Sequence, residues 1–143
     1  MRFECSGWQR RCYLREKVLK FDVFDRCFDR LGPGGHPVST GRSFSDIDAI
    51  TEIEGRGLIV EWKPAPLDIN DRDWKGQVIM FKKLTRNGML TVFVVAGDPE
   101  DMSVTHRGTF SLGRWGGWKP SSLEDLQEVV HEWVLWAQNN PFI

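Results

Sequence analysis

The run MLTVFVVAG at residues 89–97 is the feature that most limits how this chain can fold. An almost wholly apolar stretch of this length is typical of a strand buried on both faces, which requires a covering layer on each side of the sheet. The segments before and after it show the periodicities of helices and of half-buried strands. The sequence therefore predicts an α/β protein, a three-layer-type sandwich in which helices flank a small mixed β-sheet.

The expected elements run in the order helix, two strands, helix, two strands, helix. Apolar residues at helical spacing predict the first helix over residues 14–31, and Gly32-Pro33-Gly34-Gly35 ends it. The elements expected after it are strands at 42–53 and 58–63, a helix at 71–86, strands at 89–97 and 104–112, and a helix at 121–139. Residues 54–57 form the first hairpin turn, and residues 113–120 are expected to be a flexible loop. Ser121 and Glu124 predict a capping box for the last helix.

Length and composition limit the class of protein. A chain of 143 residues, 41% of them hydrophobic, fits one domain over residues 1–143 with a single core. No apolar run approaches the roughly 18 residues of a membrane span, so no membrane partner is expected. Cys5, Cys12 and Cys27 are an odd number for disulfides and, with His36, match no zinc-binding spacing, so a reducing, cytoplasmic setting is expected.

Acidic side chains gather on the two strands that precede the second helix. Alternation along a strand places Asp46 and Asp48 on one face, and it places Glu61 and Lys63 together on one face of the next strand. A hairpin would bring the two pairs side by side, and burying like charges together is costly unless a cation neutralises them. Oxygen ligands favour Mg²⁺ or Mn²⁺, and the Trp62 backbone carbonyl can add one more.

The pattern Asp48…Glu61-Trp62-Lys63, in strands that follow a helix, resembles the PD-(D/E)xK nuclease superfamily through about residue 97. The resemblance implies a restriction-endonuclease-like core in the order α-β-β-α-β-β-α. It implies that Asp48 is the principal metal ligand, Asp46 an accessory acid, Glu61 the second ligand and Lys63 the catalytic lysine. The Pro-Asp pair of the family is absent, since Ser45-Asp46 or Ile47-Asp48 stands there, so the choice between Asp46 and Asp48 stays open.

Gln77 falls within the apolar arc of the second helix, which consists of Trp74, Val78, Phe81 and Leu84. Gln77-x-x-x-Phe81 is similar to the Gln-x-x-x-Tyr element of RecB-type members, where the glutamine faces the active site. The alternative is a core glutamine that is bonded to backbone. Many members of the superfamily place another acid of the site on the first helix, and Glu16 is the candidate here. It lies at the flank of the apolar stripe of that helix, so a structural role is favoured.

Basic segments flank the acidic one. Residues 1–45 carry a net charge of +4, residues 46–63 carry −3, and residues 64–86 carry +2. This distribution suits a metal site beside a phosphate-binding surface. The residues expected to contact DNA are Lys75, Lys82, Arg86, Arg114, Trp115, Trp118 and Lys119. The alternative for the three basic residues of the second helix, Lys75, Lys82 and Arg86, is an ordinary solvated helix face. The alternative for the residues of the 113–120 loop is that their aromatic rings cap the core.

The resemblance implies a metal-dependent DNA endonuclease. Compact members include Holliday junction resolvases, so cleavage of branched DNA in recombination, repair or replication is expected. An exonuclease of RecB-like type that acts at DNA ends, and a non-catalytic nuclease-fold module that binds DNA or protein, stay open. The apolar arc of the last helix is wide enough to suggest a homodimer through Trp133 and Trp136.

Overall fold

The structure, a computed structural model, describes residues 30–31, 34, 37–38 and 47–143. The chain divides into two units, Met1–Asp46 and Ile47–Ile143. In the first unit, β1 (Arg30–Leu31) pairs antiparallel with β2 (Pro37–Val38). The helix expected over residues 14–31 was therefore wrong at its last two residues, whose backbone pairs with Pro37–Val38 instead. Residues 14–29 lie outside the described residues.

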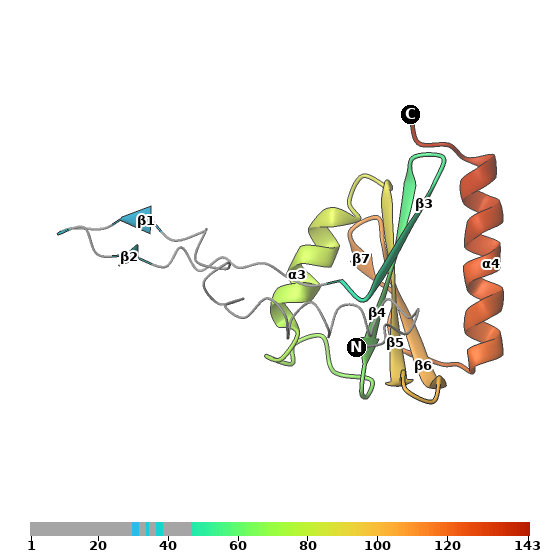
Figure 1. The fold of residues 1–143 in the computed structure, drawn as a ribbon, viewed down its shortest axis with the longest axis horizontal. Coiled ribbons are helices and arrows are strands. Elements are labelled where there is room, and N and C mark those ends of the chain that lie inside the picture. Colours follow the sequence, from blue (N-terminus) through green and yellow to red (C-terminus); the bar gives the residue numbers. More distant parts are fainter. Residues whose placement is uncertain (1–29, 32–33, 35–36, 39–46) are drawn as a thin grey trace, which may run out of the picture. The chain divides into compact units, whose positions relative to one another are not determined.

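The second unit is built on a mixed, open sheet of six strands (Figure 1). Its strands are β3 (Ala49–Ile53), β4 (Arg56–Lys63), β5 (Leu90–Asp98), β6 (Ser103–Ser111), β7 (Arg114–Trp115) and β8 (Lys119–Pro120). The order across the sheet is β3-β4-β5-β6-β7, and β8 also pairs with β6. Helix α3 (Lys75–Leu84) connects the parallel strands β4 and β5, and the other pairs are antiparallel. The predicted α/β class and mixed sheet are confirmed, while the first helix of the expected order lies in the part of the chain not described.

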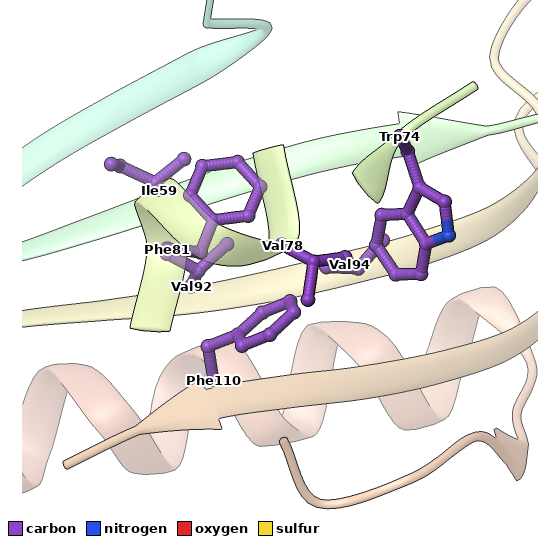
Figure 2. Close-up of a cluster of buried hydrophobic side chains, with 7 residues drawn as sticks. All are labelled: Ile59, Trp74, Val78, Phe81, Val92, Val94 and Phe110. Atoms are coloured by element: carbon purple, nitrogen blue, oxygen red, sulfur yellow. The ribbon is translucent and has the colours of Figure 1, made fainter. Parts of the chain in front are cut away.

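The sheet is covered on both faces, as the apolar run at residues 89–97 predicts. Helix α3 covers one face and α4 (Leu123–Asn139) covers the other (Figure 1). The α3-side core consists of Ile59, Trp74, Val78, Phe81, Val92, Val94 and Phe110 (Figure 2). The α4-side core consists of Leu58, Phe93, Trp133 and Ala137. Consecutive strand residues thus enter opposite cores, which is why β5 has almost no polar side chain. In the described part of the chain, no helix is long and apolar enough to cross a membrane.

A two-residue turn joins β3 to β4. Ile53 pairs with Arg56, and the intervening Glu54 and Gly55 both have positive φ, at 52° and 82°. This is the type I′ geometry, whose twist matches that of paired strands. The predicted hairpin is confirmed, with its strands at Ala49–Ile53 and Arg56–Lys63. Ile47 and Asp48 precede β3, and residues 42–46 are not described.

The segment expected to be a flexible loop, residues 113–120, instead contributes β7 and β8. Phe110 pairs with Trp115 in β7, and Arg107 pairs with Lys119 in β8. Gly113 and Gly117 have positive φ of 78° and 86°, a conformation that glycine adopts at little cost. These two positions allow the chain to turn back against β6, so the prediction of a loop was wrong.

Helix boundaries differ from the prediction by a few residues. Helix α3 begins at Lys75 because residues 71–74 form a turn in which the Asp71 carbonyl accepts from the N–H groups of Trp74 and Lys75. Leu84, expected in the apolar arc, is 41% exposed, and Thr85 is buried instead. The Thr85 hydroxyl donates to the Phe81 carbonyl at 2.7 Å, so its polar group is satisfied there.

The capping box of α4 is one residue later than expected. Ser122 accepts from the Asp125 N–H, and the Asp125 side chain accepts from the Ser122 N–H. The pairing of Ser121 with Glu124 was therefore wrong. The spacing rule itself holds, because Ser122 and Asp125 are also three residues apart.

Arg56 joins three segments that are distant in the sequence. Its Nε donates to the Asn140 carbonyl and its Nη1 to the Gly88 carbonyl, each at 2.7 Å. The guanidinium also lies 4.6 Å from the centroid of the Trp136 ring and 5.2 Å from that of Phe142. We call this arrangement the Arg56 clasp. It holds the residues after α4 against the start of β4.

Candidate active site

Two buried carboxylates lie side by side at the open end of the β3–β4 hairpin, away from its turn. Ala49 pairs with Val60, so Asp48 stands opposite Glu61 where the register continues. Each residue is only 3% exposed. The Asp48 N–H donates to Glu61 Oε2 at 3.4 Å, and the Trp62 N–H donates to Asp48 Oδ2 at 2.7 Å. The structure therefore brings Asp48 beside Glu61, as expected from a hairpin that joins the two strands.

Lys63 and Gln77 complete this group of side chains. Lys63 Nζ donates to Gln77 Oε1 at 2.5 Å and lies 3.9 Å from Glu61 Oε1. Gln77, on α3, donates through Nε2 to the same Glu61 Oε1 at 3.2 Å. The Gln77 amide thus contacts both Glu61 and Lys63, and these hydrogen bonds go to side chains rather than to backbone. We call Asp48, Glu61, Lys63 and Gln77 the acid–lysine cluster.

The acid–lysine cluster lies on the face of the sheet that α3 covers. Ile59 belongs to the α3-side core, and Glu61 and Lys63 follow it at steps of two along β4. Trp74 lies next to the cluster, with Lys63 Nζ 5.7 Å from its ring centroid, within the range of a cation–π contact. The sequence marked Trp74 only as a core residue. Its position one helical turn before Gln77 is the signal that would have placed it here.

Burial has a large effect on Glu61. Desolvation, and then repulsion by the Asp48 carboxylate, raise the pKa of Glu61 from 4.5 to about 7. The Lys63 ammonium, the Gln77 amide and the Asp48 N–H favour the charged form, but they offset only part of the increase. A carboxyl group that titrates near neutral pH beside another acid is typical of functional sites, and a bound cation would favour its charged form.

This pKa predicts how stability changes with pH. The folded protein retains the Glu61 proton up to about pH 7, whereas the unfolded chain releases it near 4.5. The folded state therefore binds more protons between these values, and its stability falls as the pH rises. At 1.36 kcal/mol per pKa unit, the loss from Glu61 is about 3 kcal/mol.

Urea unfolding of the chelator-treated protein at about pH 5 and pH 8 would measure this loss. Glu61→Gln should remove it, and the exposed Glu128→Gln should leave it unchanged. If the stability of Glu61→Gln changed with pH as much as that of the wild type, Glu61 would not be the group responsible for the loss.

The donors available for a metal ion are all oxygen atoms. Asp48 and Glu61 supply two carboxylates, and the N–H and C=O of a strand residue point to the same edge, so the Trp62 carbonyl lies on the side of Asp48. Asp46, the other expected acid, lies outside the described residues. The choice between Asp46 and Asp48 as principal metal ligand therefore stays open, and Asp48 is the one whose contacts are described. Among the residues that are described, no three His, Cys, Asp or Glu side chains gather as a metal site. This donor set nevertheless suits Mg²⁺ or Mn²⁺.

The residues expected to contact DNA fall into two groups. Lys75 and Arg86 are exposed on or just after α3, and Lys82 is half-buried. Arg114 and Lys119 are exposed on β7 and β8.

The two tryptophans of the same prediction lie against the α3-side core. The Trp115 ring centroid is 4.7 Å from that of Phe110, and the Trp118 Nε1 donates to the Leu67 carbonyl at 2.7 Å. These packing contacts match the alternative of aromatic caps over the core.

Glu16, the three cysteines and His36 lie outside the described residues, as does any contact they make. Comparison of the chain with protein-family models, with curated proteins and with solved structures gave no match. The acid–lysine cluster is consequently the feature of the chain that bears on its function.

Proposed function

We propose that this chain is a metal-dependent DNA endonuclease of the PD-(D/E)xK type. The observation that carries the proposal is the acid–lysine cluster. In it the buried Asp48, just before β3, and the buried Glu61 on β4 meet Lys63, two residues after Glu61. Structural ion pairs rarely bury two carboxylates beside each other, because the repulsion raises the free energy of the folded protein. A divalent cation bound between the two carboxylates would offset this repulsion.

Asp48, Glu61 and the Trp62 carbonyl would hold the cation, with Asp46 as a further acid. When bound, Mg²⁺ or Mn²⁺ would lower the pKa of a water ligand and stabilise charge on the phosphodiester. Glu61 would then remain ionised at neutral pH, because the cation offsets the two effects that raise its pKa.

Lys63 would act on the developing negative charge of the phosphate or orient the attacking water. Gln77 accepts one of its protons at 2.5 Å, and Glu61 lies 3.9 Å away, so the ammonium is held by two neighbours. Its side chain is 13% exposed, which leaves it access to a substrate. An ammonium that is already oriented requires little rearrangement when charge develops, and this is the basis of electrostatic catalysis. Gln77 is in this scheme a positioning residue.

An exonuclease that acts at DNA ends is the second candidate. The observation that favours it is the pair of hydrogen bonds from Gln77 to Glu61 and Lys63, because RecB-type members have a glutamine facing the active site. A non-catalytic module is disfavoured by the burial of both acids, which a binding platform does not require.

Metal dependence and product mapping test the proposal. The protein should cut DNA with Mg²⁺ or Mn²⁺ and lose this activity with a chelator, and Mn²⁺ titration should detect the site. Covalently closed plasmid separates the candidates, because only an endonuclease can cut a molecule without ends. Linear duplex, single-stranded, flap and four-way-junction substrates would show whether branched DNA is preferred. Undiminished cleavage by chelated, metal-free protein would refute the proposal.

A homodimer through α4 remains part of this proposal, because paired cuts across a junction are made most simply by a twofold assembly. Trp133 is buried in the core of its own chain and is not available for that contact, contrary to the expectation from the sequence. Leu135 and Trp136 remain exposed, at 47% and 43%. The contact would therefore depend on these two residues.

A further inference from the structure

Two cations stand opposite each other on β6 and β8. Arg107 and Lys119 are directly paired residues of this antiparallel ladder. Like charges in that position destabilise a sheet unless something neutralises them. Within the described part of the chain, neither side chain forms an ion pair. The arrangement therefore suits an anion bound between them.

A small pocket lies at this position. Its open space is about 220 Å³, including the part that is continuous with solvent. The residues that line it are Arg107, Gly108, Thr109, Gly116, Gly117 and Lys119. The cavity volume without the space open to solvent is about 40 Å³, whereas pockets for whole drug-sized ligands usually measure about 300–1,000 Å³. This pocket therefore fits a small group rather than a complete nucleotide. We call it the Arg107 pocket.

The polar groups of the Arg107 pocket match a phosphate. The Arg107 Nε is buried and has no hydrogen-bond partner among the residues that the structure describes, which is costly for a charged donor. A guanidinium presents its donors in a fork that fits two phosphate oxygens, and Lys119 adds a second positive charge. The Thr109 hydroxyl is a further donor. Gly117 has a φ of +86°, and a Cβ added there would meet nothing within 4 Å, so the backbone is open to a ligand.

The pocket is separate from the acid–lysine cluster. Arg107 pairs with Val95 and Thr109 with Phe93, and Phe93 belongs to the α4-side core. Side chains of paired residues share a face, so Arg107 points to the face opposite Glu61. The pocket does not contribute to the proposed cleavage chemistry.

We propose that the Arg107 pocket binds a phosphate group, with Arg107 as its principal ligand and Lys119 as the second cation. The group can come from free inorganic phosphate or from the backbone of a nucleic acid, and both present the same oxygens. The proposal does not depend on nuclease activity. It can be tested with chelator present, when no cleavage is expected.

The test is a titration of the whole chain with inorganic phosphate and, separately, with a short single-stranded oligonucleotide, at constant ionic strength. The Gly116 and Gly117 amide signals in NMR spectra should shift with phosphate, and fluorescence anisotropy should report the oligonucleotide. Arg107→Gln should weaken binding about tenfold or more, which corresponds to about 1.4 kcal/mol. Lys119→Gln, at an exposed position, should weaken it about threefold. Arg72→Gln, which removes an exposed arginine before α3, is the matched control.

Weaker phosphate binding in Arg107→Gln, with the control unchanged, would support a site for the free anion. The same pattern with the oligonucleotide alone would support a site for the nucleic-acid backbone. Absence of wild-type binding to either probe, or equal loss in Arg72→Gln, would overturn the proposal. If Arg107→Gln does not fold, Lys119→Gln decides between these outcomes, and an unchanged affinity in that variant would refute the pocket.

Discussion

Replacing Lys63 with alanine is expected to lower the rate of metal-dependent DNA cleavage by about 100- to 1,000-fold. Loss of one oriented group that stabilises charge in a transition state typically costs this much, about 2.7–4 kcal/mol. Lys63 is the only cation within 4.0 Å of a carboxylate in the described residues, and its partner Glu61 is a proposed metal ligand. The rate should be measured under single-turnover conditions with saturating Mg²⁺, so that chemistry is separated from DNA binding.

The control for this variant is Lys83→Ala, which removes an exposed lysine from α3 and should cleave at the wild-type rate. Mn²⁺ affinity should persist in Lys63→Ala and be lost in Asp48→Ala, because Asp48 is a proposed metal ligand and Lys63 is not. Wild-type cleavage by Lys63→Ala would disprove its catalytic role. Loss of Mn²⁺ binding in the same variant would show that Lys63 supports the structure of the site instead.

Replacing Gly97 with alanine is expected to destabilise the protein by about 2–6 kcal/mol. Gly97 has a φ of +153° at the irregularity where the β5–β6 register shifts, and an added Cβ would lie 1.9 Å from the Ser103 carbonyl oxygen. A strained backbone costs about 1–3 kcal/mol, and forcing backbone apart adds about 1–3 kcal/mol. The atoms that the added Cβ would meet first belong to the backbone of Ser103 and Val104, so no side-chain rotation relieves the contact.

Gly76→Ala provides the comparison, because a Cβ at Gly76 meets nothing within 4 Å and α3 favours alanine over glycine. That variant should be stabilised by about 0.5–1 kcal/mol. Urea unfolding of Gly97→Ala and Gly76→Ala at one pH would measure both changes in stability. A Gly97→Ala variant as stable as wild type would mean that the β5–β6 irregularity can rearrange freely.

The sequence predicted correctly those parts of the fold in which the side chains of a strand alternate regularly between its two faces. Alternation on β4 places Glu61 and Lys63 on the face opposite Leu58, and the cores on the two faces show this separation. The predicted hairpin placed Asp48 beside Glu61, and the structure has this contact although Asp48 precedes β3. A backbone N–H from Trp62 holds the Asp48 carboxylate there, and a period-two pattern does not reveal that bond.

The parts that were missed depend on contacts between distant segments. Strands β7 and β8 have two residues each, too few for any periodicity, and they exist because β6 offers a free edge. Thr85 replaces Leu84 in the buried position because its hydroxyl can bond to Phe81, which a hydrophobic pattern cannot predict. The Arg107 pocket was missed because Lys119 comes beside Arg107 only through the pairing of β6 with β8.

The Arg56 clasp has a consequence for the order in which the molecule assembles on the ribosome. Arg56 and Asn140 are 84 positions apart, so at about 5–20 residues per second the partner is synthesised roughly 4–17 s after the arginine. The Phe142 N–H, which donates to the Glu54 carbonyl at 2.9 Å, emerges later still. During translation the turn of the β3–β4 hairpin therefore gains the restraint of the Arg56 clasp only after residues 140–142 have been synthesised.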